Sequence, residues 1–328
     1  MQETPARIDT IVAALDADGR FVRESPGDHG RSAIDAVHDP AMVDFVAGAH
    51  AAWSGAAGHD IAIPDVFLHP GLRSGMPPST PPKSPLGALG YWCFETTTPM
   101  VAGTYAAARA AVDCALTATD IARSTAGASY ALCRPPGHHA ATAVFGGYFF
   151  FNNAAIAAQH AITNGADRVA ILDVDYHHGN GTQQIFYDRA DVFYASLHGD
   201  PDRAYPYFVG HAHELGTGHG HGCNVNVPLP EGCDDGRYLD ALGGVLTTLE
   251  QFAPDLLVVS LGLDLYADDP LGDFAVTTNG IGAVGEAIAS LHRPTVILQE
   301  GGYAVAALGD NAVAFLDAFT RLIDRAQR

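Results

Sequence analysis

The chain has 328 residues, of which 48% are apolar and only 16% are charged. These values suit a globular protein with a large core and exclude a disordered or fibrous chain. Its 37 acidic and 17 basic residues give a formal charge of −20, which would repel a nucleic-acid backbone and attract a cationic ligand. We therefore expect no nucleic-acid partner. The negative charge does not by itself establish a cationic ligand, because acidic residues that only keep the protein soluble would explain it equally well.

Targeting signals and disulfides are not expected. The apolar runs, such as 255–263, are far shorter than the ~20 residues needed to cross a bilayer, and the N-terminus lacks a basic stretch followed by an apolar one. We expect a cytoplasmic protein without a membrane partner. The five cysteines include no Cys-x-x-Cys pair, which favours buried free thiols over a disulfide framework or a cysteine zinc site.

The first third of the chain has an irregular pattern. A helix near 8–15 ends at Gly19, a second helix spans about 41–53, and a Pro/Gly/Ser-rich stretch from 64 to 90 is predicted to be a loop. This loop is longer than a compact domain needs for a connection, so it is a functional excursion, a subunit contact or a disordered segment. We favour the functional excursion, because the loop ends in the apolar segment 91–94.

From the middle onward, short apolar runs alternate with Ala-rich segments at helical spacing. This alternation predicts one large α/β domain with a parallel sheet covered on both faces. The predicted strands are 129–133, 168–173, 192–197, 224–229, 255–262 and 295–299. The predicted helices are 99–123, 152–163, 235–252, 278–292 and 304–325.

Three polar side chains follow predicted strands at the place where open parallel sheets bind ligands, beyond the carboxyl ends of the strands. Asp175 and His177 follow one strand, and Asp264 follows another. While the backbone stays extended, residues two apart project to one side, so Asp175 and His177 can share an ion that Asp264 reaches from a neighbouring strand. Two carboxylates and one imidazole suit zinc, and also iron(II) or cobalt, and leave a position for water. A lone Asp-x-His arises by chance, but ionised groups behind buried strands need a partner or a metal.

Two other strand ends carry residues suited to proton transfer. His138 and His139 follow a Pro-Pro-Gly turn, and histidine can take a proton from water and give one to a leaving amine. A hydrogen-bonded or packed histidine pair explains the dipeptide equally well. Asp173 and Asn180 are available to set the tautomers of the pair. Tyr303 follows a Gly-Gly pair and can donate to an oxyanion, although such a motif is also common in turns.

Together these segments resemble the arginase–deacetylase superfamily, specifically the histone deacetylase branch and the bacterial acetylpolyamine amidohydrolases within it. The matching motifs keep their order and spacing over roughly residues 90–305; they are 134–139, 146–153, 173–182, 196–198, 261–264 and 300–303. The resemblance implies the three-layer αβα arginase–deacetylase fold with a central, mainly parallel sheet. It also implies a single deacetylase domain over residues 1–328, with 64–90 as an insertion loop.

The resemblance implies roles for the catalytic candidates. Asp175, His177 and Asp264 would hold one zinc ion per subunit, with iron(II) as an alternative. His139 would be general base and then acid, and His138 would orient water and supply positive charge. Asp173 would support His138, Asn180 would lie behind His139, and Tyr303 would polarise the acetyl carbonyl. Because many histone deacetylases carry an aspartate at the Asn180 position, His139 should be a weaker base here.

The resemblance also implies further binding residues. The substrate's methylene chain would run between aromatic rings; the residues implied to line it are Tyr148, Tyr205 and Gly147. A structural potassium ion is implied as well, near Asp173, Asp175, His177, Ser196 and Leu197. The second manganese ion of arginases is not expected, because the additional ligands for it are not seen in this sequence.

The sequence also departs from the acetylpolyamine amidohydrolases. The loop at 64–90 lies where these enzymes carry a loop that packs across a dimer, so we expect a homodimer through it. Leu86 and Thr97 occupy positions where polyamine-reading glutamates are expected, and Glu95 is the nearest carboxylate. The family's first strand and the specificity loop after it are not seen before Ile8.

We expect hydrolysis of an acetylated amine, either an acetylpolyamine or a similar small substrate. A lysine deacetylase or a small-amide hydrolase using the same site is the alternative. A non-catalytic metal-binding protein with the same fold is a more remote alternative.

Overall fold

A six-stranded parallel sheet forms the centre of the computed structural model, which describes residues 2–57 and 60–326. The strands are β1 (Ala128–Ala131), β2 (Val169–Asp173), β3 (Val192–Gly199), β4 (Asn224–Leu229), β5 (Leu256–Leu261) and β6 (Thr295–Gln299). Their order across the sheet is β1-β6-β5-β2-β3-β4, and every pair is parallel. All six predicted strands are therefore present.

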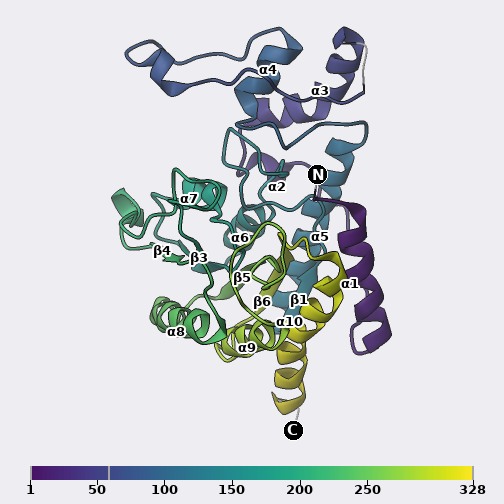
Figure 1. Ribbon diagram of the computed structural model, residues 1–328, viewed down its shortest axis with the longest axis vertical. Coiled ribbons are helices and arrows are strands. Elements are labelled where there is room, and N and C mark those ends of the chain that lie inside the picture. The colour runs from purple at the N-terminus through teal and green to yellow at the C-terminus, as the bar shows by residue number, and fades with distance from the viewer. Residues whose placement is uncertain (1, 58–59, 327–328) are drawn as a thin grey trace.

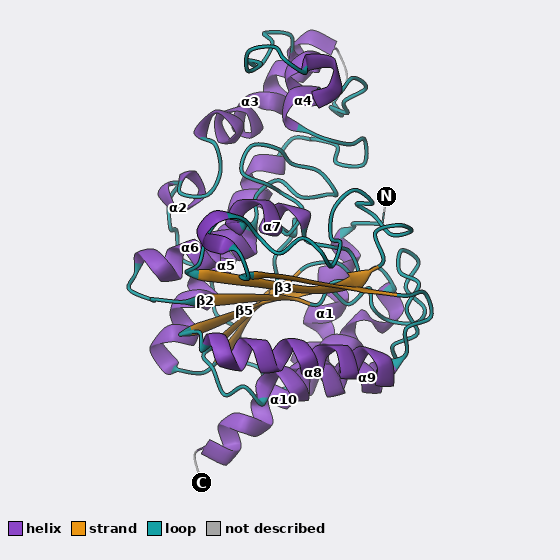
Figure 2. Cartoon of the chain, turned by 90° about the vertical axis from the view of Figure 1, so that its left-hand side faces the viewer, coloured by secondary structure: helices purple, strands orange, loops and turns teal. Residues whose placement is uncertain are grey.

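Helices cover both faces of the sheet, as Figure 2 shows with the sheet seen edge-on. One face carries α5 (Thr104–Thr125), α6 (Asn153–Thr163) and α7 (Asn180–Phe186), and the other carries α1 (Pro5–Asp18), α8 (Asp235–Phe252), α9 (Thr278–Ala289) and α10 (Val305–Ala326). Along β2, Val169 and Ile171 pack into the α5–α6 core, whereas Ala170 and Leu172 pack into the opposite core. This period of two in a strand buried on both faces confirms the predicted three-layer α/β fold.

Polar side chains cap the N-termini of three of the helices that cover the sheet. Asn152, Asp234 and Thr277 each accept a hydrogen bond from a backbone N–H in the first turn of α6, α8 and α9. Such caps satisfy donors that have no partner inside the helix. At the other end of α1, Gly19 adopts the left-handed conformation that closes the helix.

The predicted loop at 64–90 is partly wrong, because it contains helical structure. A 3-10 turn spans Pro70–Arg73, and α4 spans Pro85–Trp92 with Pro85 in its first turn. Proline is compatible with that position because the N–H it lacks would be unpaired there in any case. Figure 1 shows α4 and the preceding loop projecting together with α3 (Pro40–Ala57) from the upper end of the molecule.

The sequence did not predict the short helices α2 (Ser32–Asp35) and α7. The five cysteines are free, but only three are buried, since Cys114 and Cys223 are partly exposed. In the described part of the chain, β1 is the first strand, and no helix is long and apolar enough to span a bilayer.

Candidate active site

Four neighbouring strands bring the candidate residues to one edge of the sheet. β1, β6, β5 and β2 are adjacent in that order, and the segments that follow them carry His138, Tyr303, Asp264 and Asp175. The carboxyl ends of parallel strands share one edge, so residues far apart in sequence meet there. Asp173 lies opposite Ser260 of β5 and Ser196 of β3, which places three polar side chains at one level.

Asp175, His177 and Asp264 converge on a common point. One ligand atom from each lies within 4.8 Å of the other two. Nδ1 of His177 is 3.3 Å from Oδ1 of Asp175 and 3.0 Å from Oδ2 of Asp264. Both carboxylates are buried, whereas the His177 side chain retains 12% exposure. A buried carboxylate pair that faces one partly open imidazole suits a divalent cation with a position open to water.

The convergence of Asp175 and His177 has a different cause from the one predicted. β2 ends at Asp173, and residues 175–177 form a bend instead of extended backbone. Oδ1 of Asp175 accepts a hydrogen bond of 2.8 Å from the backbone N of His177. This aspartate turn, and not strand alternation, brings the two side chains to one side.

The surroundings of the three side chains fit a metal. A Cβ on Gly262 would lie 2.3 Å from Oδ2 of Asp175, and a Cβ on Gly301 would lie 2.2 Å from Oδ2 of Asp264, so only glycine fits at both positions. Backbone N–H groups orient both carboxylates: Gly301 donates to Asp175 at 2.7 Å, and Tyr176 donates to Asp264 at 2.9 Å. Such outer hydrogen bonds hold metal ligands in place.

The electrostatics of the cluster favour a bound cation. Burial, together with the charge of Asp175, raises the pKa of Asp264 to about 7. Burial alone would lower the pKa of His177, but its hydrogen bonds to Asp175 and Asp264 outweigh burial and raise this pKa to about 9. Two carboxylates at this depth thus favour a positive charge between them, which protonated His177 or a bound metal ion can supply.

The two adjacent histidines have different partners. Nδ1 of His138 lies 3.0 Å from Oδ2 of Asp173, and Nδ1 of His139 lies 2.6 Å from Oδ1 of Asn180. Because these oxygens only accept, both Nδ1 atoms carry hydrogen and the Nε2 atoms are left for chemistry. Nε2 of His138 is buried, has no hydrogen-bond partner in the described part of the chain, and lies 3.8 Å from Oδ1 of Asp175.

The charges of the two histidines also differ. Burial opposes protonation of His138, but Asp173 and Asp175 outweigh it and raise the pKa of His138 to about 10. Burial and the positive charge of His138 hold the pKa of His139 well below its usual value. The pair therefore presents one cationic imidazole beside one neutral imidazole, which is the combination needed for charge stabilisation and base catalysis.

Aromatic side chains surround these histidines. The ring of Tyr205 lies 5.0 Å from that of His139 and 6.1 Å from that of His177, and the ring of Tyr148 lies 6.1 Å from that of Tyr303. Gly147 has a positive φ, and a Cβ on it would lie 2.5 Å from the ring of His139. The predicted substrate-binding residues therefore do lie beside the catalytic candidates.

Two residues important for the site were not identified from the sequence. The fully buried Arg7 lies 4.8 Å above the ring of Tyr303. Glu300, the first residue of the 300–303 motif, is buried and accepts hydrogen bonds from the backbone N of Gly137 (2.6 Å) and of His138 (3.2 Å). The only sequence signal for Arg7 is its place four residues before Ile11 on the buried face of α1.

Glu95, the carboxylate nearest to the expected polyamine-reading positions, has structural partners. Its side chain accepts from the backbone N of Gly147 at 2.9 Å, and also from the backbone N of Thr97 and the hydroxyl of Thr98. The Thr98 hydroxyl in turn accepts from the backbone N of Tyr148 at 2.7 Å. Glu95 therefore holds the turn at 147–148 in place, and its hydrogen-bonding capacity is largely used.

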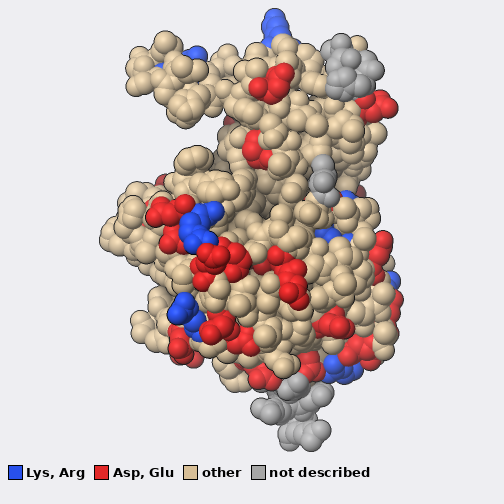
Figure 3. All heavy atoms as spheres, in the orientation of Figure 1, with Lys and Arg blue, Asp and Glu red and all other residues tan. Residues whose placement is uncertain are grey.

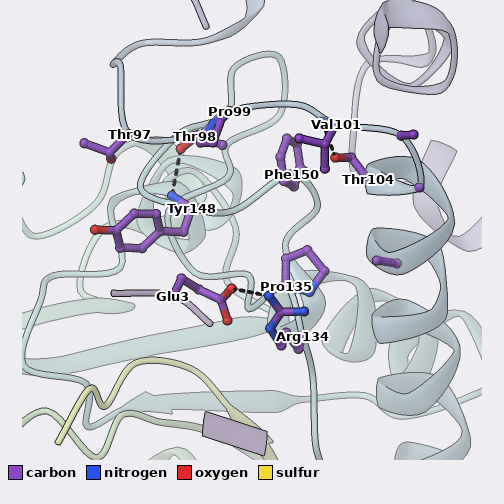
Figure 4. A pocket seen from close by; sticks show the side chains of 13 residues that line it. Glu3, Thr97, Thr98, Pro99, Val101, Thr104, Arg134, Pro135, Tyr148 and Phe150 are labelled. Carbon is purple, nitrogen blue, oxygen red and sulfur yellow. Dashed lines mark hydrogen bonds and ion pairs between the residues drawn. The ribbon is translucent and has the colours of Figure 1, made fainter. Parts of the chain in front are cut away.

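A pocket of about 340 Å³ lies beside Tyr148 and is lined by Thr97, Thr104 and Phe150, among others. Figure 4 shows Glu3 and Arg134 beside each other among the lining residues, and their ion pair measures 3.0 Å. Neither Asp175, His177 nor Asp264 lines this pocket, so it neighbours the catalytic cluster instead of containing it.

Comparison with known proteins agrees with this geometry. The family model of the histone deacetylase domain matches residues 1–319. Acetylpolyamine amidohydrolase 1 of Pseudomonas aeruginosa is 45% identical over 317 residues, which are 97% of this chain and 91% of that protein. Acetylpolyamine amidohydrolase of Mycoplana ramosa is 40% identical over 96% of this chain and 91% of its own length. The crystal structure of acetylpolyamine aminohydrolase from Burkholderia pseudomallei superposes with a TM-score of 0.92 at 42% identity, covering 98% of this chain and 92% of that one.

Proposed function

The chain belongs to the histone deacetylase domain family, and from this premise we propose that it is a metal-dependent amidohydrolase that removes the acetyl group from a small acetylated amine. The observation that carries the proposal is the convergence of Asp175, His177 and Asp264 beside one cationic and one neutral histidine. We also propose that residues 1–328 form a single deacetylase domain.

Asp175, His177 and Asp264 are the proposed metal ligands. A divalent ion held there would supply Lewis acidity, which polarises an acetyl carbonyl and lowers the pKa of water. We propose zinc, because two carboxylates and one imidazole with a vacant position suit it, and iron(II) is the alternative that metal analysis would reveal.

The chain's own residues supply the proton transfers. Nε2 of neutral His139 accepts the proton of the attacking water, because its Nδ1 is engaged by Asn180. His138, held by Asp173, orients the water and contributes positive charge. The phenol of Tyr303 stays protonated, since burial raises its pKa well above the usual value, and it donates to the developing oxyanion. A histidine then protonates the leaving amine, so that acetate and a free amine result.

The proposed substrate is an acetylpolyamine or a similar small acetylated amine. The relatives named above are acetylpolyamine amidohydrolases, and the net charge of −20 favours a cationic substrate. Tyr148, Tyr205 and Gly147 are the proposed contacts for its methylene chain. The absence of carboxylates at Leu86 and Thr97, together with the engaged carboxylate of Glu95, leaves recognition of a distant amine to other groups.

A homodimer through 64–90 is part of the proposal. This segment and its flanks expose several large apolar side chains, among them Val66 (62%), Leu72 (77%) and Met76 (60%). Exposed apolar surface of this kind marks contact sites. Figure 3 shows that the projecting loop is mostly uncharged on this face, whereas acidic side chains are spread over the body below it.

The remaining parts of the proposal concern ions and location. A structural potassium ion near Asp173, Asp175, His177, Ser196 and Leu197 is supported by the register that places Asp173 beside Ser196. We propose a cytoplasmic protein that binds neither nucleic acid nor membrane, on the basis of its charge and short apolar runs.

The substrate proposal is tested by assaying metal-reconstituted protein on acetylputrescine, acetylcadaverine, acetylspermidine, an acetyl-lysine peptide and an acetanilide. We expect the acetylated polyamines and diamines to give the highest kcat/KM. Preference for the peptide would identify a lysine deacetylase, and preference for the anilide would identify a different small-amide hydrolase. Hydrolysis of none of them by protein with bound metal would contradict the deacetylase assignment and favour a metal-binding protein without this activity.

A further inference from the structure

A second group of metal-ligating side chains lies outside the catalytic cluster. It consists of His29 in the segment between α1 and α2, Asp120 on α5 and His160 on α6. One ligand atom of each lies within 4.8 Å of the other two. Nε2 of His160 is 2.8 Å from Oδ1 of Asp120, and the rings of His29 and His160 are 5.9 Å apart at 88°. Three chain segments thus converge at one point.

The position of His29 is fixed by α5. Residues 109, 113 and 117 are four apart and therefore share one helix face. Arg109 forms an ion pair with Asp28, Asp113 accepts from the backbone N of His29 at 3.0 Å, and Thr117 accepts from the backbone N of Gly27 at 2.9 Å. Asp120 lies one turn further along the helix. The backbone contacts therefore hold the imidazole of His29 over α5 before any ion binds.

The histidine side chains are also oriented. Nε2 of His29 is 2.9 Å from the hydroxyl of Thr117, and the side-chain amide of Asn164 lies 3.3 Å from Nδ1 of His160. With an ion on Nε2 of His160, Nδ1 carries the hydrogen, and the amide accepts it through Oδ1 after rotation by half a turn. Hydrogen bonds to ligating histidines fix ring orientation in metal sites. Asp120 is half exposed, whereas the side chain of His160 is 18% exposed, so the point of convergence is open to solvent. Water can therefore complete the coordination of an ion there.

We propose that His29, Asp120 and His160 form a second, open site for a divalent transition-metal ion. Two imidazoles and one carboxylate suit zinc, nickel, cobalt or copper, whereas calcium and magnesium require more oxygen ligands than this cluster offers. The ion fastens residues 19–31 to α5 and α6. It occupies a site separate from the catalytic cluster, because none of the three ligands contacts Asp175, His177 or Asp264 in the described interactions.

The test is a metal titration of the chelator-treated protein, in which zinc binding is measured by calorimetry and cobalt binding by the visible spectrum. Wild type should bind two equivalents, and the double variant His29→Ala/His160→Ala only one. The catalytic-ligand variant His177→Ala should keep the equivalent that the double variant loses. His221→Ala, which removes an exposed histidine elsewhere, is the matched control and should bind two equivalents.

Asp120→Asn is a second variant that should remain folded, because it alters a half-exposed side chain and keeps its shape. It should weaken the second equivalent by about tenfold or more and leave the first unchanged. Metal-dependent protection of residues 19–31 against proteolysis should disappear in the double variant, while turnover of acetylputrescine stays unchanged. The proposal is contradicted if wild type binds one equivalent only, or if the second equivalent persists in the double variant.

Discussion

Nε of Arg7 donates a hydrogen bond of 2.6 Å to the carbonyl oxygen of Gly302, the residue before the proposed oxyanion donor. A second nitrogen of the same guanidinium donates to the carbonyl oxygen of Glu300 at 2.5 Å. The first helix of the chain thus holds the loop after β6 in place. This arrangement explains how α1 accommodates a fully buried arginine, where an apolar residue would otherwise be expected.

Replacing Arg7 with methionine should lower kcat about tenfold and change KM little, because the loop would no longer aim Tyr303 while the substrate contacts remain. Arg7→Lys should restore only part of the activity, since an ammonium cannot form both hydrogen bonds in the fixed geometry of a guanidinium. Arg23→Met, at an exposed arginine, is the control. A folded Arg7→Met enzyme with wild-type kcat would show that Arg7 does not position the loop for catalysis.

Tyr303→Phe should reduce turnover by about a hundredfold or more, as loss of one oxyanion donor does. The metal content should be unchanged, because Tyr303 is not a ligand. Measuring both quantities on the same preparation distinguishes a missing hydrogen bond from a missing ion. Unchanged turnover would remove Tyr303 from the mechanism.

Asn180→Asp should shift the acidic limb of the pH profile of kcat/KM to higher pH. The pKa of His139 lies well below its usual value, owing first to burial and then to the charge of His138. A carboxylate 2.6 Å from Nδ1 would stabilise protonated His139 and raise this pKa, so the neutral base would be lost at a higher pH. An acidic limb at the same pH in wild type and Asn180→Asp would mean that His139 is not the titrating base.

His38 should make the fold sensitive to acid independently of the metal. Its Nδ1 donates to the carbonyl oxygen of Ala141 (2.9 Å) and its Nε2 accepts from the backbone N of Asn152 (2.8 Å), so the folded protein holds it neutral. Burial lowers its pKa from 6.5 to about 4. The unfolded chain therefore binds more protons between these values, and stability is complete above pH 6.5 and falls as the pH drops toward 4.

The corresponding measurement is the unfolding free energy of metal-free protein against pH. Between pH 6.5 and 4, wild type should lose about 3 kcal/mol more than His38→Gln, which cannot titrate in this range. The contributions of all other titrating groups are the same in both proteins, so they cancel when the two slopes of unfolding free energy against pH are compared. Parallel slopes would show that His38 is protonated without cost in the folded state.

Strand ends were the most informative part of the sequence. Apolar runs followed by Asp175 and Asp264 predicted both the parallel sheet and the edge at which these residues meet, because burial of a whole strand leaves its polar end residue at a defined place. The order of the strands did not follow from the sequence, since pairing between distant strands depends on packing of the complete core. The resemblance supplied the roles of His138, His139 and Tyr303 that chemistry alone left open.

Backbone contacts were the least predictable part. Arg7 binds main-chain oxygens 293 and 295 positions away, and Glu95 binds main-chain nitrogens. Every residue type has these main-chain atoms, so the sequence gives no sign of which residues the two side chains bind. The bend at 175–177 was not predicted either, because strand alternation assumes that the backbone stays extended. α4 was missed because its proline and two glycines resemble those of a loop, although proline at the start of a helix is favourable.

The most direct test of the account is acetate release from acetylputrescine by zinc-reconstituted protein, measured beside His177→Ala at the same protein concentration. We predict sustained turnover by wild type, abolished by chelation and restored by zinc, and turnover at the background rate by the variant. Equal acetate release by wild type and His177→Ala, or no release by wild type that holds zinc at Asp175, His177 and Asp264, would contradict the proposed catalytic centre.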